Sequence, residues 1–287
     1  MKIGRIIKNI SNQYEVLTED NNRNSAVAMG KLRKGLTPIV GDYVEYEILD
    51  DKYAIQKVLP RKNELKRPLI ANVDQAIVVM SAKDPDFSTA LLDRLIFLIS
   101  YSNIKPVICI TKLDLIDKND VIYSYIEDYK NSGYEVYETG KDFDTQEIED
   151  ILRDKVSVLT GQSGAGKSSL INRIDESFQI KTQQTSKALG RGKHTTRHCE
   201  LFPVSGGWLG DTPGFSSLDF SNIDIIKLQE CILDFKPYIG LCKFNDCTHT
   251  SEPFCAVKEA LEQNKLSSIR YKNFIEVVEV IKSGRKF

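Results

Sequence analysis

The chain has 287 residues, of which 41% are hydrophobic and 28% charged, and its formal net charge is −1. This length allows about two or three domains, and the nearly neutral charge argues against a dedicated nucleic-acid binder. No apolar run reaches the roughly 18 residues of a membrane span, and the N-terminus lacks the apolar core of a signal peptide. We expect a cytoplasmic protein that acts as a monomer and has no membrane partner.

Residues 1–68 carry five short segments rich in Val, Ile and Tyr, which turn residues separate from one another. Such segments predict strands, and five strands in about 65 residues predict a small barrel. The oligonucleotide-binding fold (OB-fold) is our first expectation, and an SH3-like barrel is the alternative. The segment RKNELKRP (61–68) then forms a basic linker.

Four clusters of basic residues interrupt the neutral composition, at 30–35, 60–68, 190–198 and 282–287. Each of them can be a solvated loop or tail. Several on one face would instead form an electrostatic footprint for nucleic acid.

The pattern changes to alternating strands and helices over residues 69–222. Continuous apolar runs such as DQAIVVMS (74–81) and KPVICI (105–110) predict buried strands, and segments with helical spacing such as 89–102 follow them. This alternation predicts an α/β domain with a parallel sheet covered by helices on both faces.

A phosphate-binding loop follows the predicted strand KVSVLT (155–160). Its sequence GQSGAGKS matches G-x-x-x-x-G-K-S, in which glycines let backbone N–H groups converge on phosphate oxygens. Lys167 would reach the β- and γ-phosphates, and the Ser168 hydroxyl would hold Mg²⁺. A glycine-rich turn is the alternative. The nucleotide-binding residues expected here are Gly161, Gln162, Ser163, Gly164, Ala165, Gly166, Lys167, Ser168 and Ser169.

Two further motifs complete a nucleotide site. In DTPG, Asp211 would hold Mg²⁺ through water, and the Gly214 N–H would contact the γ-phosphate. In TKLD (Thr111, Lys112, Leu113 and Asp114), the carboxylate of Asp114 can accept hydrogen bonds from the two adjacent donors of guanine. Adenine offers no such pair, which argues against an ATPase. The alternative for Asp114 is a helix-capping role.

The order of these motifs is unusual, because the base-reading motif precedes the phosphate loop. This order indicates a circular permutation, which is tolerable because the termini of a domain usually lie close together at its surface. The DTPGF segment (211–215) then ends the nucleotide-binding domain and runs directly into residues 223–287, whose pattern is helical.

A cysteine and histidine cluster lies in that last region. Three of the chain's six cysteines, Cys242, Cys247 and Cys255, accompany His249, one of only three histidines. Three thiolates and an imidazole match a closed structural zinc site, so we expect one zinc ion per chain. Buried thiols or a redox role are the alternatives.

Together these motifs resemble the family of ribosome small-subunit-dependent GTPase A, bacterial circularly permuted GTPases. The resemblance covers nearly the whole chain: the barrel, ITKLDL, TGQSGAGKSSLIN, GRGKHTT, DTPGF and the cysteine cluster. It implies GTP hydrolysis stimulated by the small ribosomal subunit, binding to its rRNA, and a role in late subunit maturation. It also implies three domains, at 1–68 (OB-fold, RNA-binding), 69–222 (GTPase) and 223–287 (zinc-binding). A nucleotide-switched docking factor is the alternative.

The chain departs from the family in two motifs, and a third segment does not align with the family pattern. Thr111 stands where the family has Asn, and Arg197 stands where another Thr often follows GKHTT. The segment YETGKD (137–142 and its neighbours) lies where a backbone contact to guanine is expected.

The catalytic residues that we expect are Lys167, His194 and Thr196. Thr196, with Thr195 as the alternative, would complete the magnesium ligands together with Ser168 and Asp211. Phe215 occupies the position where many GTPases place a water-orienting Gln. His194 can take that role, or it contacts RNA while the ribosome supplies the group.

Overall fold

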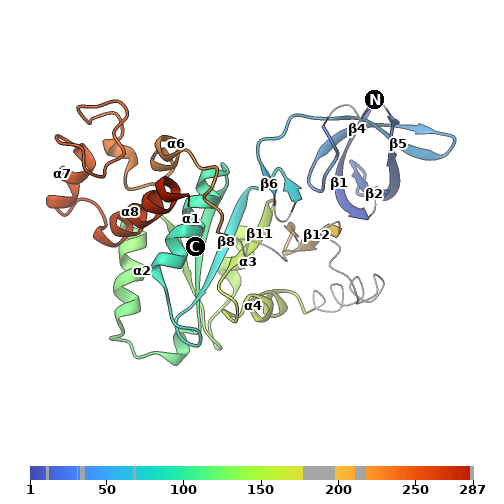
Figure 1. The fold of residues 1–287 in the computed structure, drawn as a ribbon. Coiled ribbons are helices and arrows are strands. Elements are labelled where there is room, and N and C mark those ends of the chain that lie inside the picture. The colour runs from blue at the N-terminus through green and yellow to red at the C-terminus, as the bar shows by residue number, and fades with distance from the viewer. Residues whose placement is uncertain are drawn as a thin grey trace. The chain divides into compact units, whose positions relative to one another are not determined.

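The computed structural model describes residues 1–10, 13–30, 32, 36–66, 69–176, 198–210 and 218–284. The chain divides into two compact units. Unit 1 consists of the described residues of Met1–Gln75, Thr145–Leu159 and Ser168–Gly214, and unit 2 of those of Ala76–Asp144, Thr160–Lys167 and Phe215–Phe287 (Figure 1). Within the described residues, every helix is too short or too polar to cross a membrane.

Five strands form the N-terminal barrel of unit 1. They are β1 (Lys2–Ile10), β2 (Gln13–Thr18), β3 (Arg23–Ala28), β4 (Tyr43–Leu49) and β5 (Lys52–Val58). Their order is β1-β2-β3-β5-β4, and a further β1–β4 pairing closes the barrel. The β3–β5 pair is parallel and the others are antiparallel. This closed order is that of the OB-fold, which confirms the first expectation over the SH3-like alternative.

The described part of the segment expected to be a basic linker, residues 61–66, includes a strand that pairs with residues 69–71 beside the barrel. Strands β6 (Glu64–Lys66) and β7 (Leu69–Ala71) pair antiparallel, and Ile70 forms a parallel bridge with Val40. Gly41 permits this approach, because it has φ +90° and a Cβ there would lie 2.0 Å from the Ala71 carbonyl oxygen.

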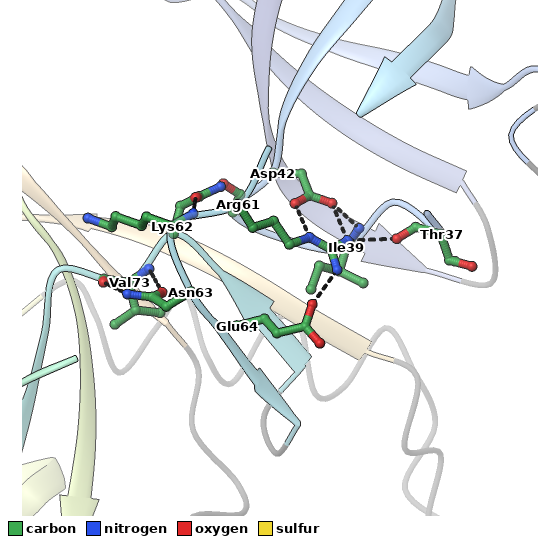
Figure 2. A network of polar contacts seen from close by, with 10 residues as sticks. Thr37, Ile39, Asp42, Arg61, Lys62, Asn63, Glu64 and Val73 are labelled. Carbon is green, nitrogen blue, oxygen red and sulfur yellow. Dashed lines mark hydrogen bonds and ion pairs between the residues drawn. The ribbon is translucent and has the colours of Figure 1, made fainter. Parts of the chain in front are cut away.

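A buried ion pair holds the same hairpin to the barrel. Arg61 donates from Nε and Nη2 to the two oxygens of the fully buried Asp42, at 2.7 and 2.8 Å (Figure 2). Arg61 also donates to the Thr37 carbonyl at 2.8 Å, and Asp42 accepts from the Ile39 N–H at 2.8 Å. A bidentate pair of this kind has fixed geometry, so residues 61–66 and 69–71 are attached to the barrel.

Among its described residues, the rest of unit 1 contains a mixed sheet and two helices, the second of which begins at Lys167 of unit 2. Strand β11 (Val156–Gly161) runs parallel to β13 (Gly207–Gly210), β13 pairs antiparallel with β12 (His198–Val204), and β12 pairs antiparallel with β1 of the barrel. The helices are α3 (Gln146–Leu152) and α4 (Lys167–Ile174), the latter directly after the phosphate loop.

Unit 2 contains the strands and helices that carry the guanine motif. Its strands lie in the order β10 (Glu135–Glu138), β9 (Lys105–Thr111) and β8 (Gln75–Ser81), and β9 and β10 are parallel. Helix α1 (Thr89–Tyr101) begins at the Ser88 cap and α2 (Val121–Asn131) at the Asp120 cap, each of which accepts a backbone N–H. The predicted α/β alternation is confirmed in these elements.

The C-terminal part of unit 2 is helical, as expected. It contains α6 (Ile225–Glu230), α7 (Ala256–Glu262), α8 (Ser268–Ser283) and the 3₁₀ turn η3 (Lys236–Tyr238). The apolar side of α8 packs against α1, where Phe274 meets Phe97 edge to face at 6.5 Å (Figure 1).

Candidate functional site

The phosphate loop lies between β11 and α4, and its glycines have conformations that other residues rarely adopt. Gly161, Gly164 and Gly166 have φ values of +120°, +78° and +85°. A Cβ on Gly161 would lie 2.0 Å from the Val79 carbonyl oxygen. The glycines are therefore required by the backbone itself, and the loop is more than a generic turn.

Lys167, the first residue of α4, folds back over this loop. Its Nζ donates to the carbonyl oxygens of Gln162 at 2.6 Å and Gly161 at 3.1 Å. Partial burial lowers the pKa of this ammonium group below its ordinary value. The charge lies at the N-terminal end of a helix, where the backbone dipole also favours anions, so the position suits a phosphate group.

Thr111 joins the guanine motif to the phosphate loop. Its buried hydroxyl lies 2.6 Å from the Ala165 carbonyl oxygen, to which it donates, and 3.2 Å from that of Met80. The Asn of related proteins is longer, but Thr111 makes the bridge with the shorter side chain.

Lys112 forms a second bridge to the same loop. It has a left-handed backbone, with φ 60°, and its Nζ donates to the carbonyls of Gly164, at 3.0 Å, and Asp84. Leu113 is buried beneath the motif, while the Asp114 carboxylate is exposed and available to a base.

A segment that the sequence left unassigned lies against Asp114. The Lys141 N–H donates to Asp114 Oδ1 at 2.9 Å, and the Leu113 N–H donates to the Thr139 carbonyl at 3.2 Å. A Cβ on Gly140 would lie 2.6 Å from Asp114 Oδ1. Residues 139–141 thus lie against the TKLD motif. The signal in the sequence is Gly140, two positions after the end of strand β10.

The loop 82–88, between β8 and α1, also contributes to the site without a sequence signal. The Gln162 side-chain amide donates to the Asp86 carbonyl at 2.8 Å, and Lys112 contacts the Asp84 carbonyl. Both contacts use backbone oxygens, which every residue has, so no motif could have marked them.

The other predicted nucleotide residues divide into two groups. Ser163 is exposed in the loop, and Ser168 and Ser169 are exposed at the start of α4. His194, Thr195, Thr196, Asp211, Gly214 and Phe215 lie outside the described residues.

The predicted metal cluster is brought together in unit 2. The Nδ1 atom of His249 lies 3.6, 3.4 and 3.2 Å from the sulfurs of Cys242, Cys247 and Cys255. The sulfurs of Cys242 and Cys255 lie 3.9 Å apart, and all four ligand atoms lie within 4.8 Å of one another.

These separations fit a single tetrahedral metal ion. With metal–ligand bonds of about 2.0–2.3 Å, tetrahedral ligands lie about 3.5–3.8 Å apart. Burial raises the pKa of the Cys247 thiol to about 12, so a cation is needed to stabilise its thiolate. Three soft sulfur ligands and one imidazole favour zinc over magnesium or calcium.

Glu252 holds the loop that carries His249 in place. Its carboxylate accepts from the N–H and hydroxyl of Thr248, at 2.8 and 2.7 Å, and from the Thr250 N–H at 2.9 Å. Burial would raise the pKa of Glu252, but these hydrogen bonds outweigh it and lower the pKa to about 2. The Glu252 carboxylate takes the place of backbone carbonyls as the acceptor for the Thr248 and Thr250 N–H groups. A short loop in which His249 has a left-handed backbone cannot supply those carbonyls itself.

The fold and the site together define a class, the circularly permuted P-loop GTPases, in which the base-reading motif precedes the phosphate loop. Family models assign the chain further: the RsgA GTPase model matches residues 58–221 and the RsgA N-terminal domain model matches residues 3–55. The chain belongs to the RsgA GTPase family, which confirms the resemblance inferred from its motifs.

Relatives and solved structures agree over the full length. The chain is 46% identical, over 99% of both chains, to "Small ribosomal subunit biogenesis GTPase RsgA" of Bacillus subtilis, and 47% identical to the Bacillus cereus protein of that name, also over 99% of both. It resembles the crystal structure of YloQ, "a circularly permuted GTPase", with TM-score 0.85, 42% identity and coverage of 100% and 97%. It also resembles the crystal structure of YjeQ from Thermotoga maritima, with TM-score 0.86, 32% sequence identity and coverage of 99% of both chains.

Proposed function

We propose that the protein hydrolyses GTP to GDP and phosphate in the cytoplasm and that the small ribosomal subunit stimulates this reaction. The protein acts in late maturation of that subunit through contact with its rRNA. The observation that supports the proposal is the Thr111–Ala165 hydrogen bond, which joins the TKLD segment to the GQSGAGKS loop. The chain also shares 46% identity with a protein named for small-subunit biogenesis.

The residues have separate roles in this proposal. Lys167 neutralises phosphate charge, and Asp114, oriented by the Lys141 N–H, selects guanine. Ser168, Asp211 and either Thr196 or Thr195 organise Mg²⁺, which would stabilise the charge that develops on the transferred phosphoryl group. The proposed domains end at residues 68, 222 and 287, and the OB-fold contacts RNA.

Zinc is the metal that we propose for the cluster in the last domain, with one ion per chain. Cys242, Cys247, His249 and Cys255 would hold it and leave no open coordination position. Its role is then structural, because a closed site has no room for a substrate.

The test of guanine selection is Asp114→Asn. The amide can donate to the C2 carbonyl of xanthine, whereas guanine offers an amino group there, so we expect weaker GTP binding and a shift toward xanthine nucleotides. Asp117→Asn, an exposed carboxylate three positions further along, is the matched control and should bind GTP normally. An unchanged preference in Asp114→Asn would remove this residue from the base site.

The test of the reaction is GTP turnover measured with and without purified small ribosomal subunits. We expect slow intrinsic turnover, since Phe215 cannot orient water, and a large increase when subunits are added. If nucleotide-dependent binding to subunits occurs without stimulated turnover, the protein is a nucleotide-switched docking factor instead.

We propose His194 as the group that orients water in the stimulated state, because a neutral imidazole can accept a hydrogen bond from water near pH 7. His194→Ala should then keep GTP affinity and subunit binding but lose most of the stimulated rate. Full stimulation in this variant would assign the role to the ribosome.

A further inference from the structure

A fully buried arginine on α8 joins the C-terminal region to two helices of the nucleotide-binding part of unit 2. Arg270 has no exposed surface. Its Nη2 lies 3.1 Å from Asp128 of α2, its Nη1 lies 3.4 Å from Asp234 and its Nε lies 3.6 Å from Asp93 of α1. One cation therefore connects three carboxylates from separate segments.

Other donors and rings complete this cluster. Asp93 accepts from the Tyr129 hydroxyl at 2.8 Å and from the Asn273 amide at 2.6 Å, and Ser267 donates to Asp128 at 2.8 Å. The guanidinium lies over the rings of Tyr129 and Tyr134, at 4.4 and 4.9 Å from their centres. Burial would lower the pKa of Arg270, but the carboxylates outweigh it and raise the pKa, so the cation is permanent.

Helix α8 is also tied to the metal cluster. The Tyr271 hydroxyl donates to the His249 carbonyl at 2.8 Å. Phe235 packs edge to face on the His249 ring, with centres 6.1 Å apart, and on Phe274 of α8, at 5.1 Å. Phe274 in turn meets Phe97 of α1. Polar contacts and aromatic contacts thus both connect the cysteine and histidine cluster to α8, and α8 to α1.

Each of the two helices that Arg270 connects follows a segment of the nucleotide site. These segments are loop 82–88 and the TKLD motif, and Lys112 of the motif donates a hydrogen bond to the loop. Helix α1 begins directly after loop 82–88, whose backbone accepts from Lys112 and Gln162. Helix α2 follows the guanine motif and its 3₁₀ turn η2 (Leu113–Leu115). A change in the spacing of α1 and α2 would therefore change the spacing of these segments around the base.

We propose that Arg270 is a positioning residue for guanine-nucleotide binding, which fixes α1 relative to α2 and makes nucleotide affinity depend on the C-terminal region. The inference rests on the proposed function, since it needs guanine nucleotide at Asp114. A ligand that displaces α8 would weaken nucleotide binding, and bound nucleotide would by reciprocity resist that displacement.

The test is the affinity of the full-length, metal-loaded protein for a fluorescent GDP analogue. In Arg270→Lys the charge remains, but a single ammonium cannot span three carboxylates with the geometry of a guanidinium. We expect its Kd to rise about tenfold, equal to about 1.4 kcal/mol. Asp128→Asn, which removes the negative charge that α2 contributes and leaves Arg270 with two carboxylates, should fold readily and raise Kd about threefold.

Two controls separate positioning from stability. Val277→Ala removes buried volume from α8 without touching the charged cluster, and Glu276→Ala removes the more exposed ion pair between α8 and Arg94 of α1. Both should keep Kd within about twofold, even where Val277→Ala lowers the melting temperature as much as Arg270→Lys does.

A second readout follows the segments themselves. Hydrogen exchange should accelerate at residues 82–88 and 111–115 in Arg270→Lys and remain unchanged there in Val277→Ala. An unchanged Kd in Arg270→Lys and Asp128→Asn, or a Kd that simply follows melting temperature in all variants, would overturn the proposal. If the wild-type protein does not bind the analogue, the proposed function fails, and the exchange measurement still decides whether Arg270 positions these segments.

Discussion

Each compact unit contains an arginine paired with a fully buried aspartate, and the two clusters differ in charge balance. In unit 1, Arg61 faces the fully buried Asp42 with two hydrogen bonds and retains some exposure at its edge, where Glu64 also reaches it. In unit 2, the fully buried Arg270 faces three carboxylates. The first cluster has one buried and one exposed carboxylate around its cation, whereas the second has three carboxylates around its cation and therefore a larger excess of negative charge.

The clusters also differ in the length of chain that they span. Arg61 and Asp42 are 19 positions apart, so this pair attaches a hairpin to the neighbouring barrel. Arg270 and Asp128 are 142 positions apart, and Asn273 and Asp93 are 180 apart. Loss of the first should loosen one local attachment, whereas loss of the second should affect all of unit 2.

Removal of the proposed metal is the strongest way to break this comparison, because Tyr271 of α8 and Phe235 both contact the predicted ligand His249. Structural zinc contributes roughly 10–16 kcal/mol of apparent binding energy in small modules. Cys247→Ser, or a chelator, should therefore unfold residues 223–284 first and release about one zinc per chain by elemental analysis. Cys231→Ser, outside the cluster, should keep the metal. A metal-free chain with normal melting would contradict the structural role.

Arg270→Ala should have the next largest effect, because it leaves the fully buried Asp93 and the partly buried Asp128 and Asp234 without their cation. Breaking a buried pair costs about 3–5 kcal/mol, so urea unfolding of the C-terminal part of unit 2 should shift strongly to lower concentration. Nucleotide affinity should fall with it. A shift no larger than that of Glu276→Ala would show that the buried cluster adds little stability.

Asp42→Ala should cost less, about 2–4 kcal/mol. It removes both bonds to Arg61 and the acceptor of the Ile39 N–H, but Arg61 lies near enough to the surface to be hydrated. We expect the barrel to unfold at lower urea concentration while the affinity for GDP stays normal. Glu64→Ala, the exposed partner, should change stability by less than about 1 kcal/mol.

The pH dependence of stability should show the smallest effect. It tests the difference in charge balance between the Arg61 and Arg270 clusters. Burial raises the pKa of Asp93 to about 6, although Arg270 opposes this. The folded state then binds this proton more tightly than the unfolded chain, so its contribution is fully present below about pH 4 and is lost as pH rises to about 6. Across this window, the free energies of unfolding of wild type and of Asp93→Asn should change by amounts that differ by at most about 3 kcal/mol, as urea unfolding at each pH would measure. Equal changes would contradict the shift.

Short-range patterns determined much of this protein. Alternating and helical apolar spacing predicted the barrel, the α/β elements and the C-terminal helices, because these periods follow from local backbone geometry. The phosphate loop and the metal ligands were recognisable for the same reason, since Gly161, Gly164 and Gly166 must adopt left-handed conformations and the four ligands lie within one short segment. The order of the motifs indicated the permutation without any coordinates.

Tertiary structure decided what depends on partners far apart in the chain. The Thr111 bridge to Ala165, the placement of Gly140 and Lys141 beside Asp114, and the role of loop 82–88 all use backbone carbonyls or N–H groups, which leave no mark on residue identity. No motif in the sequence marks Arg270. Only the folded chain shows that three distant carboxylates surround it, because burial is a property of the neighbours that the fold assembles and not of the residue alone.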